Sequence, residues 1–364
     1  MNETTNNKRY TASVIGGGAG GTLSMTALHE SDRFELVAMA DLNPDVCERT
    51  RERFPNIQTF TSHEALFAAM PTDVVCVSTF PPSHEEVTMA ALELPLKGIL
   101  VEKPLGHTAA SGRRILSAIQ ERGLPLAVPH GLLVSPTPRE VIARVQRGNI
   151  GELKLVEIQN THWDIINAGI HWLNFFVRLT NNEPMEHVMA ICEASTRTYR
   201  DGMQVETTAV TYAQTESGIR VVMNTGDDVQ INQAGKHTLF RIVGTLGLIE
   251  FWGWENEYRI VNAQFPSGKT IVPADVSTSR HQRHLERMAD MMDGVRDGEM
   301  GVEYSIPESS LLALEICEGA YISSRYRCKV TFPVDQFEPP AEPSWNPGTP
   351  YSGSGGGRDG RKLT

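Results

Sequence analysis

The sequence predicts an α/β protein of two domains, in which a doubly wound parallel sheet precedes an α+β domain with a large, open, mostly antiparallel sheet. A chain of 364 residues is too long for one ordinary compact core. Up to about residue 130, short apolar runs alternate with helix-patterned segments, whereas after Gly151 strand-like segments follow one another directly. We therefore expect a first domain at residues 1–130, a second at 131–338, and a tail at 339–364.

The first domain alternates between apolar runs and segments with helical spacing of their apolar residues. Strands that are apolar along their whole length, each joined to the next by a helix, are typical of a parallel sheet covered on both faces. Right-handed crossovers then make the fold doubly wound. The strand-like runs are ASVIGGG (12–18), FELVAMAD (34–41), DVVCVSTF (73–80), GILVEKPL (98–105) and PLAVPHGLLV (125–134), and the helix-like segments are 21–30, 43–54, 83–94 and 111–123.

The second domain has the pattern of a sheet with tight turns. Strands without interleaved helices indicate a mostly antiparallel sheet with one face open to solvent or to a partner. A large open face is typical of a subunit interface, so we expect a homo-oligomer, a dimer or tetramer formed through this sheet. The expected strands lie within 154–163, 188–199, 207–215, 219–225, 238–253 and 258–265, and the expected helices at 164–179, 279–297 and 308–324.

Composition excludes several classes of partner. The formal net charge of −11 argues against a broad nucleic-acid footprint, which needs clustered Lys and Arg. Five cysteines, without a C-x-x-C pair, suit a reducing compartment. The polar N-terminus shows no secretory signal, and no apolar run approaches the roughly 18 residues of a membrane helix. We expect a cytoplasmic protein without nucleic-acid or membrane partners, whose Pro/Gly/Ser-rich tail is either disordered or an arm on a neighbouring subunit.

A glycine-rich turn follows the first apolar strand. The segment VIGGGAGG fits G-x-G-x-x-G with Gly16, Gly18 and Gly21. It opens a helix-like run, and an acid, Asp41, comes 20 residues after the last glycine. Together these features are typical of the dinucleotide fingerprint of a Rossmann fold, with an ordinary strand-to-helix loop as the alternative. The first glycine permits the tight turn, the second lets the backbone approach a pyrophosphate, and the third allows close packing of helix on strand.

The predicted cofactor is NAD. The amides of Ala19 and Gly20 would face its phosphates at the positive N-terminus of the helix. Asp41 would accept hydrogen bonds from the adenosine ribose hydroxyls, and its carboxylate would repel the 2′-phosphate of NADP.

The segment VEKPLG places Glu102, Lys103 and Pro104 at the C-terminal end of a buried strand. Open α/β sheets bind ligands at this edge. Pro104 restricts the preceding lysine to extended backbone, and a partly desolvated Lys103 could handle protons near neutral pH. The alternative is a solvated lysine at a strand end, paired with Glu102.

A single histidine, His171, stands in the apolar segment NAGIHWLN, one helical turn after Asn167. It is a buried core residue, a metal ligand or a catalytic acid/base. His281 and His284 have i, i+3 spacing but lack further ligands at metal-binding spacing, so we expect no metal site. We expect a solvated helix face here, with a substrate hydrogen bond as the alternative.

Four segments in this order resemble the Gfo/Idh/MocA family of nicotinamide-dependent oxidoreductases: the glycine-rich turn, VSTFPPSHEEV at 77–87, VEKPLG, and NAGIHWLN. The resemblance covers about residues 10–335. It implies a Rossmann domain that binds NAD(P), with Lys103 and His171 in the positions of the family's catalytic lysine and histidine. The cofactor-contacting T-P-P-x-x-H segment and its neighbours correspond to Thr79, Pro81, His84, Glu102 and Lys103, with Phe80 inserted.

The chain departs from the family pattern at two places. Asn167 stands where members commonly have Asp, and an amide can orient a hydroxyl but cannot take its proton. Asp164 lies two helical turns before His171, too far to replace that carboxylate directly. The run at 131–134 is apolar where relatives carry polar residues, which suggests an apolar substrate wall. The expected substrate contacts are Lys103, His130, Trp163, Asp164, Asn167, His171 and Trp172, with domain-interface core as the alternative for both tryptophans.

These features predict an NAD-dependent dehydrogenase that oxidises a secondary hydroxyl of a sugar, glycoside or cyclitol, with C3 of a glucoside favoured by the apolar wall. His171 would remove the hydroxyl proton, Lys103 would polarise the oxygen, and Asn167 would orient the substrate. Two alternatives stay open: a non-catalytic NAD-binding sensor or assembly protein, and an NAD-dependent glycosidase that works by transient oxidation and elimination.

Overall fold

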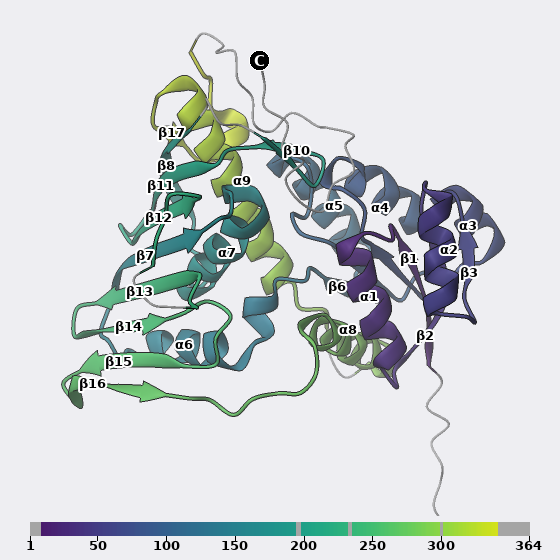
Figure 1. Ribbon diagram of the computed structural model, residues 1–364, viewed down its shortest axis with the longest axis horizontal. Helices are drawn as coiled ribbons and strands as arrows, with labels where there is room; N and C mark the ends of the chain where they lie inside the picture. The colour runs from purple at the N-terminus through teal and green to yellow at the C-terminus, as the bar shows by residue number, and fades with distance from the viewer. Residues whose placement is uncertain (1–8, 194–197, 232–234, 299–300, 341–364) are drawn as a thin grey trace, which may run out of the picture. The chain divides into compact units, whose positions relative to one another are not determined.

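The computed structural model describes residues 9–193, 198–231, 235–298 and 301–340 (Figure 1). They divide into two compact units. Unit 1 comprises Met1–His107, Ser111–Pro129 and Thr278–Pro307, and unit 2 comprises Thr108–Ala110, His130–Ser277 and Glu308–Thr364. The predicted tail lies almost entirely outside the described residues.

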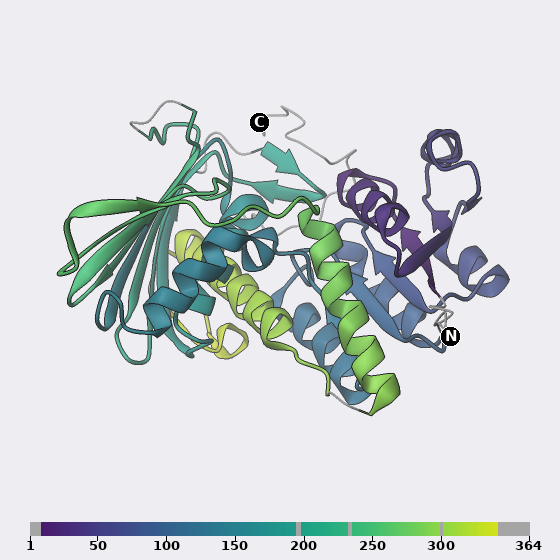
Figure 2. The ribbon, with the colours of Figure 1, turned by 90° about the horizontal axis from the view of Figure 1, so that it is seen from below.

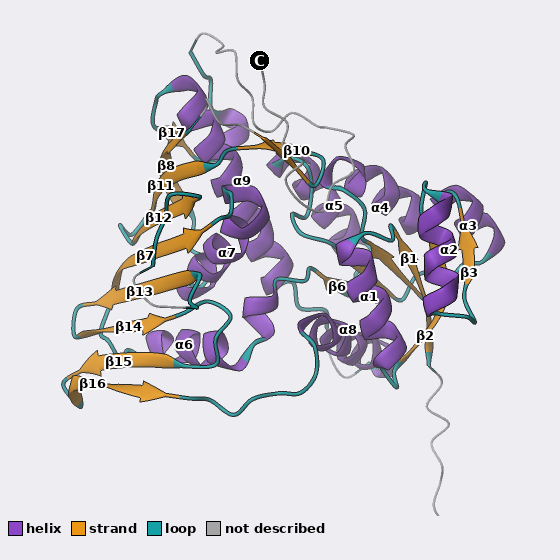
Figure 3. Cartoon of the chain, viewed as in Figure 1, coloured by secondary structure: helices purple, strands orange, loops and turns teal. Residues whose placement is uncertain are grey.

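Unit 1 is built on a six-stranded parallel sheet in the order β3-β2-β1-β4-β5-β6. Figure 3 colours its strands orange and its helices purple. Its central strands are buried on both faces, as the continuous apolar runs predict. The strands are β1 (Tyr10–Ile15), β2 (Phe34–Ala40), β3 (Gln58–Phe60), β4 (Val74–Val77), β5 (Gly98–Val101) and β6 (Leu126–Ala127). The helices are α1 (Ala19–Glu30), α2 (Pro44–Arg53), α3 (His63–Ala69), the 3₁₀ turn η1 (Pro81–Ser83), α4 (His84–Leu92), α5 (Ala109–Glu121, of which 111–121 belong to unit 1) and α8 (Arg280–Asp297).

The helix α8 belongs to unit 1, whereas the sequence analysis placed residues 278–307 in the second domain. Its apolar face, with Leu285, Met288 and Met292 buried, packs on the Rossmann-type sheet beside β5 and β6. The sulfur of Met292 lies so close to Gly98 that a side chain there would displace it. The helical periodicity shows that this face must be covered, but it does not say which sheet covers it.

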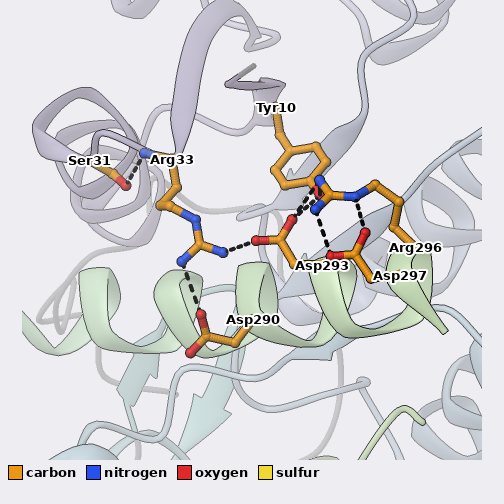
Figure 4. A network of polar contacts seen from close by, with 7 residues as sticks. All are labelled: Tyr10, Ser31, Arg33, Asp290, Asp293, Arg296 and Asp297. Atoms are coloured by element: carbon orange, nitrogen blue, oxygen red, sulfur yellow. Dashed lines mark hydrogen bonds and ion pairs between the residues drawn. The ribbon is translucent and has the colours of Figure 1, made fainter. Parts of the chain in front are cut away.

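Polar contacts fasten α8 to the first two strands (Figure 4). The Tyr10 hydroxyl donates to Asp293 Oδ1 at 2.6 Å, and Arg33 pairs with both Asp290 and Asp293. Burial, with the neighbouring Asp293 carboxylate, raises the pKa of Tyr10 to about 12. Arg296 completes the cluster through Asp293 at 2.9 Å. These contacts join the two ends of unit 1 in sequence.

Unit 2 contains a nine-stranded sheet in the order β16-β15-β14-β13-β7-β12-β11-β8-β17. Every neighbouring pair is antiparallel except β7 and β12. The predicted fold class is thereby confirmed for both sheets. The strands are β7 (Leu153–Thr161), β8 (Met185–Cys192), β11 (Thr208–Thr215), β12 (Arg220–Gly226), β13 (Thr238–Gly244), β14 (Gly247–Phe251), β15 (Tyr258–Asn262), β16 (Phe265–Ile271) and β17 (Val330–Thr331), with β9 (Thr198–Arg200) and β10 (Met203–Val205) as a separate pair.

Helices cover one face of this sheet (Figure 2). Phe175 of α7 packs edge-on against Phe240 and Phe251, and Ser323 of α9 accepts from the Ala190 amide. The elements are η2 (Gly131–Val134), α6 (Pro136–Gln146), the π-helical turn η3 (Ile165–Gly169), α7 (Ile170–Leu179), α9 (Ser305–Tyr326, in unit 2 from Glu308) and η4 (Val334–Gln336).

The other face of the sheet is open and mixed in character. Met189, Ile191 and Val210 are exposed there, and Arg241 bridges towards Glu157 and Glu250 across neighbouring strands. Association through this face stays a prediction. Among the described residues, no helix has both the length and the apolar character needed to span a bilayer.

Candidate active site

The glycine-rich turn of unit 1 has the backbone that its sequence predicts. Gly16 has φ of +95°, where a side chain would also collide with the Ser78 carbonyl. A side chain at Gly21 would overlap the Gly16 carbonyl, so this glycine allows α1 to lie directly on the turn. Around Gly18, in contrast, a Cβ would meet nothing within 4 Å. The backbone at Gly18 is therefore open to a ligand.

This opening fits a pyrophosphate. Gly18 caps α1 with extended backbone, and the first amides of a helix, including those of Ala19 and Gly20, have no intrahelical acceptor. Such amides attract anions at the positive end of the helix. Asp41 follows β2, and its Oδ2 accepts from the Gly17 amide at 2.7 Å. The same carboxylate accepts from the Asn43 amide through Oδ1 at 2.8 Å, so it is held beside the turn.

His84 ties the loop after β4 to the loop after β5. The side chain is fully buried, and its ring nitrogens lie 3.0 Å from the Thr79 carbonyl and 2.9 Å from the Pro104 carbonyl. Burial lowers the pKa of His84, while the two carbonyls oppose that shift. This predicted cofactor contact thus positions backbone rather than a ligand. Pro81 begins the short turn η1 and is also buried.

At the end of β5, Glu102 is buried and bonded to a residue from the far end of the sequence. Its Oε1 lies 2.8 Å from His281 Nε2, and its Oε2 accepts from the Lys103 amide at 3.2 Å. Burial would raise the pKa of Glu102, but His281 and the Lys103 charge lower it overall. The carboxylate also borders Gly20, where a Cβ would stand 3.1 Å from it. His281 therefore belongs to this cluster of unit 1 and does not lie on a solvated helix face.

In unit 2, Asp164 organises the turn that carries the second half of the candidate residues. The Asn167 amide and its side-chain Nδ2 both donate to Asp164 Oδ1, at 2.8 Å and 2.9 Å. Arg200 donates to Asp164 Oδ2 at 2.8 Å, and both members of this ion pair are buried. Asp164 was expected at the substrate, whereas the structure uses it to fix the amide of Asn167. A π-helical turn commonly marks a functional site.

A second buried carboxylate, Glu206, supports the same turn. It accepts from the Ile165 amide at 2.7 Å and from the Tyr321 hydroxyl at 2.8 Å. Burial, reinforced by the Asp164 carboxylate, raises the pKa of Glu206 from the ordinary 4.5 to about 7. No sequence motif marks Arg200, Glu206 or Tyr321 as part of the site.

This shift predicts a pH dependence of stability. Between pH 4.5 and about 7, folded protein retains a proton on Glu206 that the unfolded chain has lost, so stability falls as pH rises through this window. The variant Glu206→Gln should remove this decrease in the free energy of unfolding, which is on the order of 1–3 kcal/mol. Urea unfolding at several pH values measures it, with exposed Glu216→Gln as the control. Parallel profiles for Glu206→Gln and the unmodified protein would contradict the assignment.

His171 lies in the first turn of α7 and is only partly buried. Its Nδ1 is 3.2 Å from Nδ1 of His130, whose Nε2 is 2.8 Å from the Ser310 hydroxyl. His130 was expected to contact substrate, but its side chain is fully buried. His171 therefore bonds through one ring nitrogen to a buried histidine, while part of its ring stays exposed. A histidine that only fills the core would be buried completely.

Three tryptophans differ in their exposure. Trp172, an expected substrate contact, is 2% exposed and packs edge-on against Phe240, so it belongs to the core. Trp163 is 42% exposed and stacks under the Arg200 guanidinium at 4.2 Å. Trp254, which lies in no predicted motif, is 40% exposed, and its ring centroid lies 5.7 Å from that of His171. The predicted apolar wall at 131–134 is likewise buried, so exposed aromatic surface near His171 comes from Trp254.

The candidate residues thus form one cluster in each unit. Unit 1 holds the glycine-rich turn, Asp41, the Thr79 loop, Glu102 and Lys103, and unit 2 holds His130, Trp163, Asp164, Asn167 and His171.

Two proteins of named activity are similar in sequence to parts of this chain. D-apiose dehydrogenase of Paraburkholderia graminis is 26% identical over 148 residues, which are 41% of this chain and 39% of that relative. The chain thus spans about two fifths of the length of this relative. Inositol 2-dehydrogenase of Acidiphilium cryptum is 24% identical over 254 residues, 65% of this chain and 74% of that protein.

Solved structures share the fold over most of the chain. An inositol dehydrogenase homolog from Azotobacter vinelandii, crystallised with NADH and myo-inositol, has a TM-score of 0.75 at 18% identity and covers 89% of this chain and 98% of its own. Residues 11–130 match the model of an oxidoreductase family with an NAD-binding Rossmann fold, which confirms the predicted cofactor domain. Residues 11–130 thus match the NAD-binding domain of the Gfo/Idh/MocA family of oxidoreductases, the family that the sequence motifs resemble.

Proposed function

We propose that this protein is an NAD-dependent dehydrogenase that oxidises a secondary hydroxyl of a sugar, glycoside or cyclitol. The observation that carries the proposal is His171, a partly exposed imidazole with one nitrogen engaged by a buried histidine and a half-exposed tryptophan at its side. The open turn at Gly18, with Asp41 beside it, supports NAD as the cofactor.

The roles of the residues follow from the chemistry of alcohol oxidation. NAD, when bound, supplies the acceptor for the hydride that leaves the carbinol carbon. His171 takes the hydroxyl proton, and the Lys103 ammonium stabilises negative charge that develops on the oxygen. Asn167 orients the hydroxyl through its amide, whose rotamer is fixed by Asp164. Because an amide cannot take a proton, the proton transfer depends on His171 and Lys103.

The substrate class is a ring with apolar C–H faces. Trp254 offers an exposed aromatic face beside His171, and aromatic rings present large apolar surfaces for contact. Trp163 offers a second face, although the Arg200 guanidinium already covers one of its sides. Such surfaces suit a pyranose or cyclitol ring. The apolar wall that favoured C3 of a glucoside is buried, so the oxidised carbon is left to the substrate test. The named activities of the two curated relatives, on apiose and inositol, support a polyol of this size.

Absorbance at 340 nm tests the proposal directly. Purified protein with NAD should produce NADH from at least one member of a panel of methyl glucosides, inositols and free sugars. Tight NAD binding without turnover across the panel would favour the non-catalytic sensor.

The carboxylate of Asp41 should decide the cofactor preference. Removing it in Asp41→Ala should raise the Kd for NAD by about 10-fold or more, since hydrogen bonds to charged groups contribute roughly 1.5–3 kcal/mol. The same variant should reduce the ratio by which the protein binds NAD more tightly than NADP. Fluorescence titration with both cofactors measures this, with exposed Asp45→Ala on α2 as the matched control. An unchanged ratio of NAD to NADP affinity would exclude Asp41 from the ribose site.

A further inference from the structure

We propose that His130 and Ser310 form a buried hydrogen-bond chain that holds His171 in the tautomer whose Nε2 is unprotonated, the form that can act as a base. The inference rests on the proposed function, and it assigns to His130 and Ser310 a positioning role in place of the expected substrate contact of His130. All three residues lie in unit 2, and they come from segments far apart in the sequence.

The hydrogen-bond chain consists of two contacts, and His130 and Ser310 are shielded from water. His130 precedes the turn η2, is fully buried, and places its Nδ1 3.2 Å from His171 Nδ1. Ser310, on α9, is also fully buried, and its hydroxyl lies 2.8 Å from His130 Nε2. The two imidazole rings meet edge to face, with centroids 5.1 Å apart and planes at 78°. Bulk water does not reach His130, so its ring nitrogens bond within the protein, here to His171 and Ser310.

Within this chain of three side chains, counting protons leaves two neutral arrangements. A hydrogen bond between two Nδ1 atoms needs one proton, and a neutral imidazole carries a proton on only one nitrogen. In the first arrangement His171 Nδ1–H donates to His130, whose Nε2–H donates to the Ser310 hydroxyl, and His171 Nε2 is a base. In the second, Ser310 donates to His130 Nε2, His130 Nδ1–H donates to His171, and His171 Nε2 carries a proton and cannot accept one.

Ser310 makes the first arrangement possible because a hydroxyl can accept as well as donate. A group at this place that could only donate would fix His130 with a bare Nε2 and leave His171 in the inactive tautomer. The first arrangement also serves the charged state. When His171 Nε2 takes the alcohol proton, the resulting imidazolium still donates from Nδ1 to a neutral acceptor. The partner that selects the tautomer of a catalytic histidine is commonly a carboxylate or a backbone carbonyl, and here it is a second imidazole.

The tautomer can be read by NMR without turnover. In protein labelled with ¹⁵N-histidine, long-range proton–nitrogen spectra distinguish the protonated from the bare ring nitrogen, and His171→Ala assigns the His171 signals. We expect neutral His171 to carry its proton on Nδ1, and this preference to be lost in His130→Phe. His130→Asn, whose amide oxygen can still accept from His171 Nδ1–H, should restore it. A proton on His171 Nε2 in the unmodified protein, or an unaltered tautomer in His130→Phe, would overturn the proposal.

Kinetics separate positioning from simple packing. His130→Phe should lower kcat about 10–100-fold, the size of effect seen when an outer partner of a functional histidine is removed, with KM and the Kd for NAD within about 2-fold. His130→Asn should recover most of the rate, and His187→Phe on β8 serves as the matched control for folding. An unchanged kcat in His130→Phe, when His171→Ala is inactive, refutes this inference alone. Full activity of His171→Ala refutes the proposed function instead.

Discussion

Replacing His171 with Ala should lower kcat by roughly 10²–10⁴, the usual contribution of a positioned general base. The loss should fall on kcat more than on KM, because the imidazole acts on the proton that moves in the reaction and contributes little to holding the ring. Steady-state rates at 340 nm, on the substrate identified from the sugar and inositol panel, measure it.

Two controls define this result. NAD affinity should be unchanged in His171→Ala, since the glycine-rich turn and Asp41 belong to the other unit. His187→Ala, a histidine of the same sheet domain, should retain the full rate. A kcat within 2-fold of the unmodified protein would remove His171 from the mechanism.

Replacing Arg200 with Met should destabilise the protein by about 3–5 kcal/mol, because it leaves the buried Asp164 carboxylate without its cation. Asp164 and Glu206 already repel each other, so the loss of the guanidinium removes the only charge of opposite sign that is bonded to Asp164 among the described residues. The turn η3 should loosen with it, which should reduce kcat as well. Urea unfolding followed by tryptophan fluorescence gives the free energy.

The matched control is Arg241→Met. Arg241 forms half-exposed ion pairs on the open face of the sheet, where such pairs contribute roughly 0–1 kcal/mol. The double variant Asp164→Asn with Arg200→Met should regain part of the stability, because neither charge is then left buried alone. An unfolding curve of Arg200→Met that coincides with that of Arg241→Met would show that the buried pair contributes nothing.

The architecture was predictable because each sheet has its own periodicity. Apolar runs joined by helices predicted the parallel sheet, and consecutive strands predicted the antiparallel one. The sequence pattern predicts no helix at α6, because two prolines, Pro136 and Pro138, are typical of a loop. Proline is nevertheless well tolerated in the first turn of a helix. The placement of α8 was also missed, since an amphipathic pattern specifies a buried face without naming its partner.

The candidate site could be predicted only where its residues lie close together in sequence. The residues predicted from local motifs are those whose neighbours in sequence form a recognisable pattern. They are Gly16, Asp41, Lys103 and His171. Other residues of unit 2 contact this site from strands, loops and helices that are distant in sequence, and no local spacing marks them. They are Arg200, Glu206, Trp254 and Ser310. His130 was identified as part of the site but with the wrong contact, because the sequence does not show that it is buried behind His171.

The central claim is that a hydride leaves a ring carbon of the substrate for the cofactor, and an isotope measurement tests it most directly. C-deuterated myo-inositol and C-deuterated methyl glucoside would each be incubated with the protein and NAD, and the mass of the NADH would be determined. We predict NADH that carries one deuterium from at least one of these rings. Unlabelled NADH, or no NADH from either ring or from the wider sugar panel despite NAD binding, would contradict the account.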